Sequence, residues 1–181
     1  MLYFVGHIIR GEAGKYHTRL TQELSEKFDI HPLHLKVPPH LTFKAPFKTD
    51  TISNIQKVTE QFIKNTKSTA FTFDGFGNFR QGTIYINVKP SVEMVESVDA
   101  YQRELFSMDL LQREKFEPSS STLHASVARK FPKNKFDEIW EYIRAFQPPN
   151  FKLNFDSIAI LEHDGKRWNI HSEFCFQPTN S

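Results

Sequence analysis

The feature that most constrains this chain is a short motif that occurs twice: a histidine followed two residues later by a hydroxyl side chain. The first copy is His40-Leu41-Thr42, and the second, almost half the chain later, is His124-Ala125-Ser126. Both copies lie in strand-forming sequence, where successive side chains point to opposite faces, so each histidine shares a face with its own hydroxyl. Two imidazoles, each beside a hydroxyl, have the makings of a general acid and a general base around a phosphate group.

The elements predicted around the two motifs follow the same order twice. Apolar spacing of two indicates strands, and spacing of three to four indicates helices. This order is strand, helix, motif strand, helix, strand. The first set of elements is predicted at 2–10, 14–28, 40–45, 52–65 and 69–79. The second set is predicted at 83–89, 92–110, 122–129, 134–146 and 151–162. Asp164-Gly165 is a hairpin turn, and 167–176 is predicted as a last strand.

This repetition predicts one domain, residues 1–181, built from sequence repeats at approximately 1–80 and 82–177. The expected fold class is α+β, with two lobes that each consist of an antiparallel sheet with helices on its outer face. The two motif strands should occupy equivalent positions and face one central cleft.

The amino-acid composition limits which binding partners and which cellular compartment we expect. The formal net charge is +2, with 23 Lys and Arg against 21 Asp and Glu, and no dense basic tract indicates a non-specific duplex binder. The lone Cys175, expected to be buried, excludes an intramolecular disulfide and a multi-cysteine zinc site. No stretch approaches the roughly 20 apolar residues of a membrane span, and the first residues lack the basic segment of a signal peptide. We therefore expect a cytoplasmic protein without a membrane contact, and a monomer.

The side chains of the two motifs suggest a chemical role for each motif residue. His40 and His124 are the candidate acid/base pair, and Thr42 and Ser126 supply hydroxyl donors for the phosphate oxygens. Nothing in this set needs a metal or another cofactor. A metal site made by His31, His34 and His40 is the competing interpretation, but its loop carries three prolines and no carboxylate at regular spacing.

Four other residues are candidates for substrate binding. Strand parity places Lys44 on the face of His40 and Lys130 on the face of His124, with Arg129 beside it. In strand 83–89 the apolar side chains fill one face, so Tyr85 points to the other face and contacts the substrate if that face is the cleft. The remaining histidines are expected to be structural or surface residues (His7, His17, His163, His171). The phenylalanine stripe is expected to belong to the core and not to a platform for stacking RNA bases (Phe71, Phe73, Phe76, Phe79).

At this point the chain resembles the 2H phosphoesterases, the group that includes 2′-5′ RNA ligase-like proteins and RNA 2′,3′-cyclic phosphodiesterases. The resemblance rests on the two motifs, on the Pro38-Pro39 lead-in to His40, and on the closing hairpin that contains Gly165 and Trp168. It implies a duplicated α+β fold in which His40 and His124 are the acid/base pair and Thr42 and Ser126 bind the phosphate. It also implies a partner that is RNA with a 2′,3′-cyclic phosphate end, or a cyclic nucleotide.

Two hypotheses of different classes follow. The first is a metal-independent hydrolase that opens a 2′,3′-cyclic phosphate; the resemblance favours a 2′-phosphate product, and 2′-5′ ligation is the same chemistry in reverse. The alternative is a non-catalytic RNA- or nucleotide-binding module on the same fold. Both histidines and both hydroxyls are present, which favours the enzyme.

Overall fold

The computed structural model describes residues 1–79, 82–108, 111, 113, 117 and 119–177. The strands and helices follow one another in this order: β1 (Leu2–Ile8), α1 (Gly11–Phe28), β2 (His40–Lys48), α2 (Ile52–Lys64), β3 (Thr69–Phe79), β4 (Thr83–Pro90), α3 (Val92–Phe106), β5 (His124–Arg129), α4 (Phe136–Arg144), β6 (Asn150–Phe155), β7 (Ser157–His163) and β8 (Trp168–Cys175). Three short 3-10 helices are η1 (Leu33–Leu35), η2 (Ser120–Thr122) and η3 (Lys133–Lys135).

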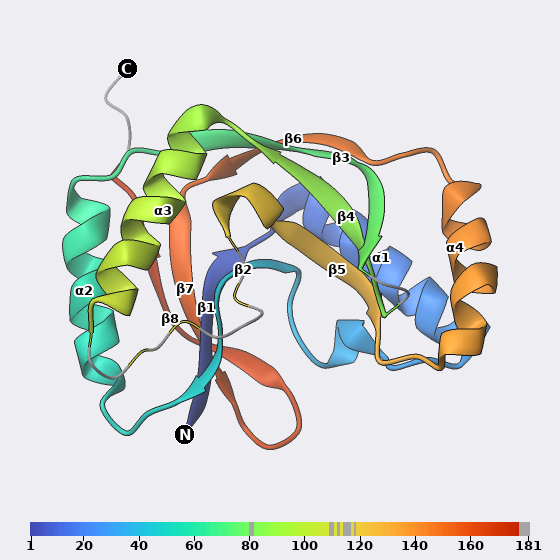
Figure 1. The fold of residues 1–181 in the computed structure, drawn as a ribbon, viewed down its shortest axis with the longest axis horizontal. Helices are drawn as coiled ribbons and strands as arrows, with labels where there is room; N and C mark the ends of the chain where they lie inside the picture. Colours follow the sequence, from blue (N-terminus) through green and yellow to red (C-terminus); the bar gives the residue numbers. More distant parts are fainter. Residues whose placement is uncertain (80–81, 109–110, 112, 114–116, 118, 178–181) are drawn as a thin grey trace.

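The strands form two antiparallel four-stranded sheets, in the orders β2-β1-β7-β8 and β5-β4-β3-β6. Helices α2 and α3 lie at one end of the molecule and α1 and α4 at the other, with the strands between them (Figure 1). The predicted α+β class and the two-sheet architecture are confirmed. Each motif strand, β2 and β5, is an edge strand of its sheet, and the two edges contact one another.

The sheets do not coincide with the sequence repeats. The first sheet joins β1 and β2 from the first repeat to β7 and β8 from the end of the chain, while β3 of the first repeat pairs in the second sheet. The single strand predicted at 151–162 is wrong: it is two strands, β6 in one sheet and β7 in the other, separated at Asp156. Apolar periodicity cannot show this break, because both halves are rich in strand-forming residues.

A single large core runs through both lobes. It includes Val5, Leu41 and Phe43 from the first sheet and Phe73 and Ile86 from the second, all 0% exposed. A smaller cluster (Phe4, Ile8, Ala159, Leu161) lies on the opposite face of the first sheet and is covered by Val37 and Trp168. The motif residues lie beside this smaller cluster, so the cleft side of the first sheet has its own apolar floor.

The ends of helix α3 and the exposure of Cys175 can be described from the contacts at these residues. Ser91 caps α3, because its side chain accepts a hydrogen bond from the Met94 backbone N–H at 3.2 Å. Helix α3 ends at Phe106 rather than at 110, and residues 109–110 of that prediction lie outside the described part of the chain. Cys175 is exposed, not buried as expected, because β8 is an edge strand.

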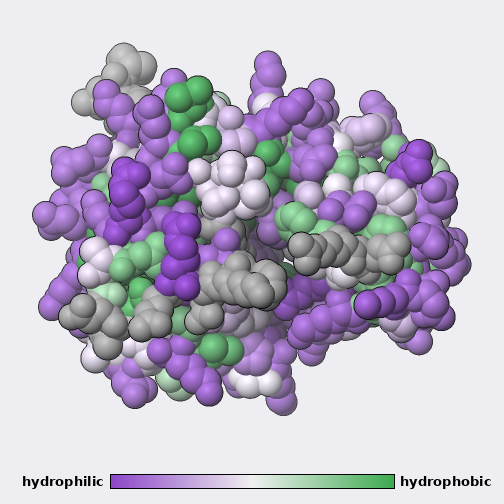
Figure 2. All heavy atoms as spheres, in the orientation of Figure 1, coloured by the Kyte–Doolittle hydropathy of each residue, from purple (hydrophilic) through white to green (hydrophobic). Residues whose placement is uncertain are grey.

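The face seen in Figure 1 is mostly hydrophilic, and its hydrophobic residues form small separate patches (Figure 2). None of the helices in the described ranges combines the length and apolar character needed to cross a membrane.

Candidate active site

The two motif strands have the same alternation. In β2, His40 and Thr42 are half-buried while Leu41 and Phe43 are fully buried. In β5, His124 and Ser126 are half-buried while Ala125 and Val127 are buried. The histidine and the hydroxyl of each motif therefore share a face, and the apolar residues between them anchor the strand in the core.

Both imidazoles are held in the same way. Nδ1 of His40 lies 2.8 Å from the backbone oxygen of Pro38, and Nδ1 of His124 lies 2.9 Å from that of Thr122, in each case two residues earlier. A carbonyl oxygen only accepts, so Nδ1 carries the proton and donates it. Nε2 of each ring has no hydrogen-bond partner among the described residues, which leaves it available to take or give a proton in the cleft.

The hydroxyl groups of the two motifs, on Thr42 and Ser126, also lack hydrogen-bond partners among the described residues. Glycine makes room beside the first motif: Gly6 pairs with Thr42, and a Cβ at Gly6 would lie 2.1 Å from the Leu41 carbonyl oxygen. Each motif therefore offers one imidazole nitrogen and one hydroxyl without a partner among the described residues, and both are groups that contact phosphate oxygens. The cavity beside the first motif is lined by His40 and Thr42, whereas His124 and Ser126 are not among its lining residues.

A β-bulge follows each motif and changes the parity of the next residues. In β2 the register shifts between Thr42 and Lys44, and in β5 it shifts between Ser126 and Ala128. A bulge adds one residue to one strand, so the simple alternation used for the sequence prediction does not extend past it.

The placement of Lys44 on the face of His40 is therefore wrong. Its side chain is 1% exposed and its Nζ lies 3.0 Å from a carboxylate oxygen of Glu117, whose side chain is also 1% exposed. Glu117 additionally accepts a hydrogen bond from the Ala45 backbone N–H. Lys44 thus ties the segment before η2 to β2, and it does not line the cavity beside His40.

The same kind of bulge brings Arg129 to the site. Arg129 and Lys130, at the end of β5, line a cavity of about 310 Å³ together with His40 and Thr42. Burial lowers the pKa of Arg129 from its ordinary value of 12.5, yet the group stays a cation at neutral pH. Lys130 has a φ of 57°, in the left-handed region, at the point where the strand ends. Both residues therefore line the cavity beside His40, and Arg129 shares a face with Ser126 only through the bulge.

Tyr85 lies on the motif face of the second sheet. It pairs with Ser126, and its ring centroid is 5.0 Å from that of His124. Phe79 contacts both rings, at 4.4 Å from Tyr85 and 4.8 Å from His124, and it is 42% exposed. The expectation that Phe79 belongs to the core is wrong, whereas Phe71 and Phe73 are buried as expected. Gly77 leaves space for this cluster, since a Cβ there would lie 2.5 Å from Tyr85 Cε2.

The two motif histidines titrate in different surroundings. Burial lowers the pKa of His40 to about 4, and the nearby positive charges of Arg129 and of protonated His17 and His124 add to this effect. Burial also lowers the pKa of His124, but no neighbouring cation contributes. Burial therefore favours the neutral imidazole at both positions, and at His40 the neighbouring positive charge favours it further.

Two buried polar side chains brace the motif strands at their bulges. His17 of α1 donates from Nε2 to the Ser126 backbone oxygen at 2.8 Å, and Gln102 of α3 donates to the Phe43 backbone oxygen at 2.7 Å. Burial lowers the pKa of His17 to about 4, so it is neutral. Neither residue was singled out as functional from the sequence. The available signal was a polar residue on the apolar stripe of a helix, since His17 shares its face with Leu20 and Leu24.

The remaining histidines separate into different sites. His31 and His163 line the cavity beside His40, whereas His34 lies 3.5 Å from the Ser25 hydroxyl. In the described ranges no three His, Cys, Asp or Glu residues gather into a metal-ligating group. The three histidines of the metal hypothesis are thus not brought together.

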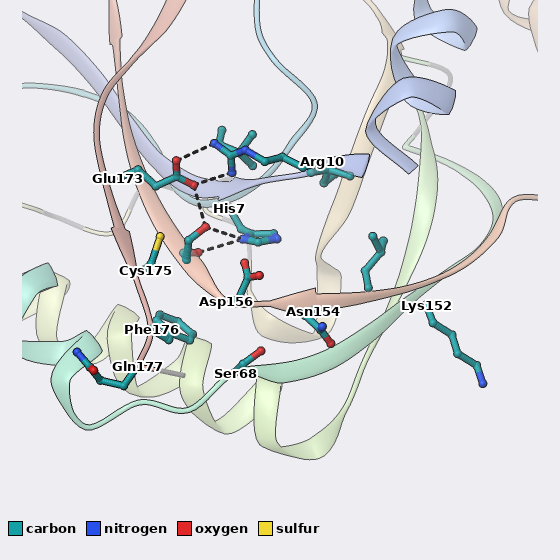
Figure 3. Close-up of a pocket in the computed structure, with 14 residues that line it drawn as sticks. His7, Arg10, Ser68, Lys152, Asn154, Asp156, Glu173, Cys175, Phe176 and Gln177 are labelled. Carbon is teal, nitrogen blue, oxygen red and sulfur yellow. Dashed lines mark hydrogen bonds and ion pairs between the residues drawn. The ribbon is translucent and has the colours of Figure 1, made fainter. Parts of the chain in front are cut away.

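His7 lies in a separate and larger hollow of about 780 Å³, which residues of β1, β6, β7 and β8 line (Figure 3). A chain of contacts runs from Arg10 to Glu173 at 2.7 Å, from Glu173 to the Ser157 hydroxyl at 2.9 Å, and from the Ser157 backbone oxygen to His7 Nδ1 at 3.0 Å. Burial lowers the pKa of His7. Only one imidazole is present on the described walls of this hollow, and its own contacts are with structural groups, so the hollow does not offer the two imidazoles that β2 and β5 carry.

Comparisons with known proteins agree with this geometry. The family model of the 2′-5′ RNA ligase superfamily matches residues 13–167. A protein of Geobacillus sp. (strain WCH70), whose name makes it a candidate phosphoesterase, is 24% identical over 156 residues, which cover 82% of this chain and 83% of that protein.

Two solved structures share the fold. The protein TT0787 of Thermus thermophilus superimposes with a TM-score of 0.60 at 13% identity, over 97% of this chain and 98% of the other. LigT of E. coli superimposes with a TM-score of 0.58 at 11% identity, over 96% of each chain. The family match over most of the length, on this fold, shows that the chain belongs to the 2′-5′ RNA ligase superfamily of 2H phosphoesterases, with an activity of the phosphoesterase type.

Proposed function

We propose that this protein is a metal-independent phosphodiesterase that opens a 2′,3′-cyclic phosphate on an RNA end or a nucleotide. The observation that carries the proposal is the matched pair of His40 and His124. Each donates from Nδ1 to a carbonyl oxygen two residues earlier and keeps Nε2 free beside a free hydroxyl. E. coli LigT, which shares this fold, has been solved in complexes with NADP+, 3′-AMP and ATP, all of them nucleotides.

The chemistry needs two proton transfers. His40 Nε2 takes a proton from a water molecule while the water oxygen bonds to phosphorus. The bond from phosphorus to O3′ breaks, and His124 Nε2–H gives its proton to O3′, which leaves a 2′-phosphate and a 3′-hydroxyl. Thr42 and Ser126 donate to the phosphate oxygens as charge builds on them, and Arg129 supplies positive charge. Ligation to a 2′-5′ bond follows the same steps with the 5′-hydroxyl of a second RNA in place of water: its oxygen bonds to phosphorus as it loses its proton, the bond from phosphorus to O3′ breaks, and O3′ takes a proton.

The charge environment assigns the two roles. A general base must be neutral, and His40, with its pKa lowered to about 4, stays neutral beside Arg129. A general acid must be protonated, and His124 has no cationic neighbour that opposes its protonation. We therefore assign His40 as the base and His124 as the acid.

The test is steady-state hydrolysis of adenosine 2′,3′-cyclic phosphate, in EDTA, by wild type, His40→Ala and His124→Ala. Loss of a general acid or base should lower the rate by on the order of 10²–10⁴-fold, and the double variant should lose much less than the product of both. A second substrate, a diester whose leaving group is p-nitrophenolate, separates the roles, because a good leaving group needs no acid. His124→Ala should retain far more of its activity on that ester than His40→Ala does.

Circular dichroism of each variant provides the folding control, since neither substitution removes a large apolar side chain from the core. Activity lost in EDTA and restored by a divalent cation would exclude the mechanism. So would a folded His40→Ala or His124→Ala protein with near wild-type turnover of the cyclic nucleotide. The reverse leaving-group pattern would exchange the two roles.

A further inference from the structure

Positive charge is concentrated on the His40 side of the cleft. The cavity there is lined by four Lys and Arg side chains (Lys36, Arg129, Lys130, Lys166) and by three histidines, with no Asp or Glu among its described lining residues. The whole chain is nearly balanced, at 23 basic against 21 acidic residues. This local excess of cations is therefore a property of the cavity and not of the protein at large.

Three distant segments assemble this cluster. Lys36 follows η1, Lys130 follows β5, and Lys166 lies in the hairpin between β7 and β8. The hairpin is held against the η1 segment by the Trp168 backbone N–H, which donates to the Lys36 carbonyl oxygen at 2.8 Å. The Asp164 carboxylate of the hairpin is directed to the backbone N–H groups of Lys166 and Arg167 and to the Asn169 side chain.

The ammonium groups of Lys36, Lys130 and Lys166 have no carboxylate partner among the described residues. By contrast, Lys15, Lys44 and Lys89 each make an ion pair. Their field is felt inside the cavity, where burial and then the charges of Lys130, Arg129 and Lys36 lower the pKa of His31. Unpaired like charges that lie close together repel one another, and a bound anion would relieve this repulsion.

The opposite side of the cleft has a different character. Around His124 the neighbours are the rings of Phe79 and Tyr85, and Phe79 is 42% exposed. A ring face suits a nucleobase, and a cationic wall suits phosphate. The two motifs therefore have unlike surroundings, aromatic beside His124 and cationic beside His40.

We infer that Lys36, Lys130 and Lys166 form a subsite for a second phosphate group, so that the preferred substrate carries a phosphate in addition to the cyclic one. The inference rests on the proposed function, because it places the cyclic phosphate between His40 and His124. The substrate class is a cyclic-phosphate nucleotide that is also phosphorylated or esterified at its 5′ oxygen. Trp168, in edge-to-face contact with Phe4 at 4.7 Å, forms the apolar floor of this subsite.

The experiment compares three substrates that differ only at the 5′ position: adenosine 2′,3′-cyclic phosphate, the same compound with a 5′-phosphate, and a dinucleotide that ends in the cyclic phosphate. Wild type should show a higher kcat/KM for both two-phosphate substrates. Lys36→Gln and Lys166→Gln should each raise KM for those substrates by about three- to tenfold, the range for a charge-assisted contact at a partly exposed site. The preference should shrink as salt is added. A difference between the two two-phosphate substrates tells a terminal phosphate from a linking one.

Lys64→Gln is the matched control, because Lys64 is an exposed lysine in the last turn of α2 and does not line the cavity. It should leave the substrate preference unchanged. If Lys36→Gln and Lys166→Gln change all three substrates equally, or if wild type shows no preference, the subsite is wrong and the cluster only attracts anions.

Binding without turnover separates this inference from the proposed function. Titration calorimetry with adenosine 2′-phosphate and adenosine 2′,5′-bisphosphate should show tighter binding of the bisphosphate, with the difference reduced in the Lys36→Gln/Lys166→Gln double variant. That result without any hydrolysis would sustain the subsite and reject the phosphodiesterase. Hydrolysis of the cyclic nucleotide together with equal binding of the two compounds would support the phosphodiesterase and reject the subsite.

Discussion

The two motif histidines differ in the charges around them, and this difference sets the expected pH dependence. Burial and neighbouring positive charges lower the pKa of His40 to about 4, and burial lowers that of His124 below its ordinary value of 6.5. Raising the pH through a lowered pKa removes the proton that the acid must donate. An imidazole in the free protein therefore loses its acid form at a more acidic pH than a free imidazole does.

We expect the falling limb of kcat/KM, which reports the free protein, to lie below about 6.5. A bound phosphate anion stabilises the imidazolium and raises its pKa, so the falling limb of kcat, which reports the complex, should lie at higher pH. Both profiles come from initial rates of cyclic-nucleotide hydrolysis between pH 4 and 9 at constant ionic strength. Superimposable limbs, or a kcat/KM that rises steadily to pH 9, would contradict this account.

At the scale of elements, the bulges in β2 and β5 decide which side chains reach the cleft. The bulge in β2 turns Lys44 into the protein interior, where its side chain pairs with that of Glu117, both 1% exposed. The pair also lies beside the rings of Phe47 and Phe106, at 5.8 and 5.7 Å from Lys44 Nζ. A buried pair of this kind connects β2 to the segment that leads into η2 and the second motif.

Removing one partner leaves a buried charge without its counterion, which typically costs about 3–5 kcal/mol. We therefore expect Lys44→Met and Glu117→Gln each to lower the free energy of unfolding substantially, as measured by urea denaturation. The Lys44→Met/Glu117→Leu double variant should recover most of the loss, because it leaves no uncompensated charge. Lys89→Met, which breaks an exposed pair with Asp74, is the control and should change stability by less than about 1 kcal/mol. A double variant as unstable as the sum of the singles would show that the charges themselves are needed.

At the scale of the whole molecule, the exchange of strands between the repeats joins the two lobes into one folding unit. The first sheet needs β7 and β8 from the end of the chain, and β1 pairs with β7 along Tyr3 to Gly6. The large core also draws residues from both sheets. Neither sequence repeat contains a complete sheet.

A fragment of residues 1–80 should therefore fail to fold alone, and so should a fragment of residues 82–177. The measurement is circular dichroism and amide-proton dispersion of each fragment, with the full chain as the control. Mixing the two fragments should restore structure, because together they supply every strand pair of both sheets. A cooperative unfolding transition in either fragment alone would contradict the shared core.

The α+β class, the two motif strands and the pairing of each histidine with a hydroxyl could all be predicted from the amino-acid sequence. These follow from alternation along a strand, which is a local property and survives any tertiary arrangement. The sequence also indicated Tyr85, Arg129 and Lys130, since each lies next to or opposite a motif.

Other features could not be predicted from the alternation of side chains along a strand, because they depend on how distant segments pack in the folded protein. Bulges after Thr42 and Ser126 buried Lys44 and turned Arg129 toward the cleft, because one inserted residue reverses the parity of all that follow. The break at Asp156 sent β6 and β7 into different sheets, and long-range packing brought His17, Lys36 and Lys166 to the motifs from three separate segments. Such contacts depend on which strands pair across the whole chain, and that information is not present in any single stretch of it.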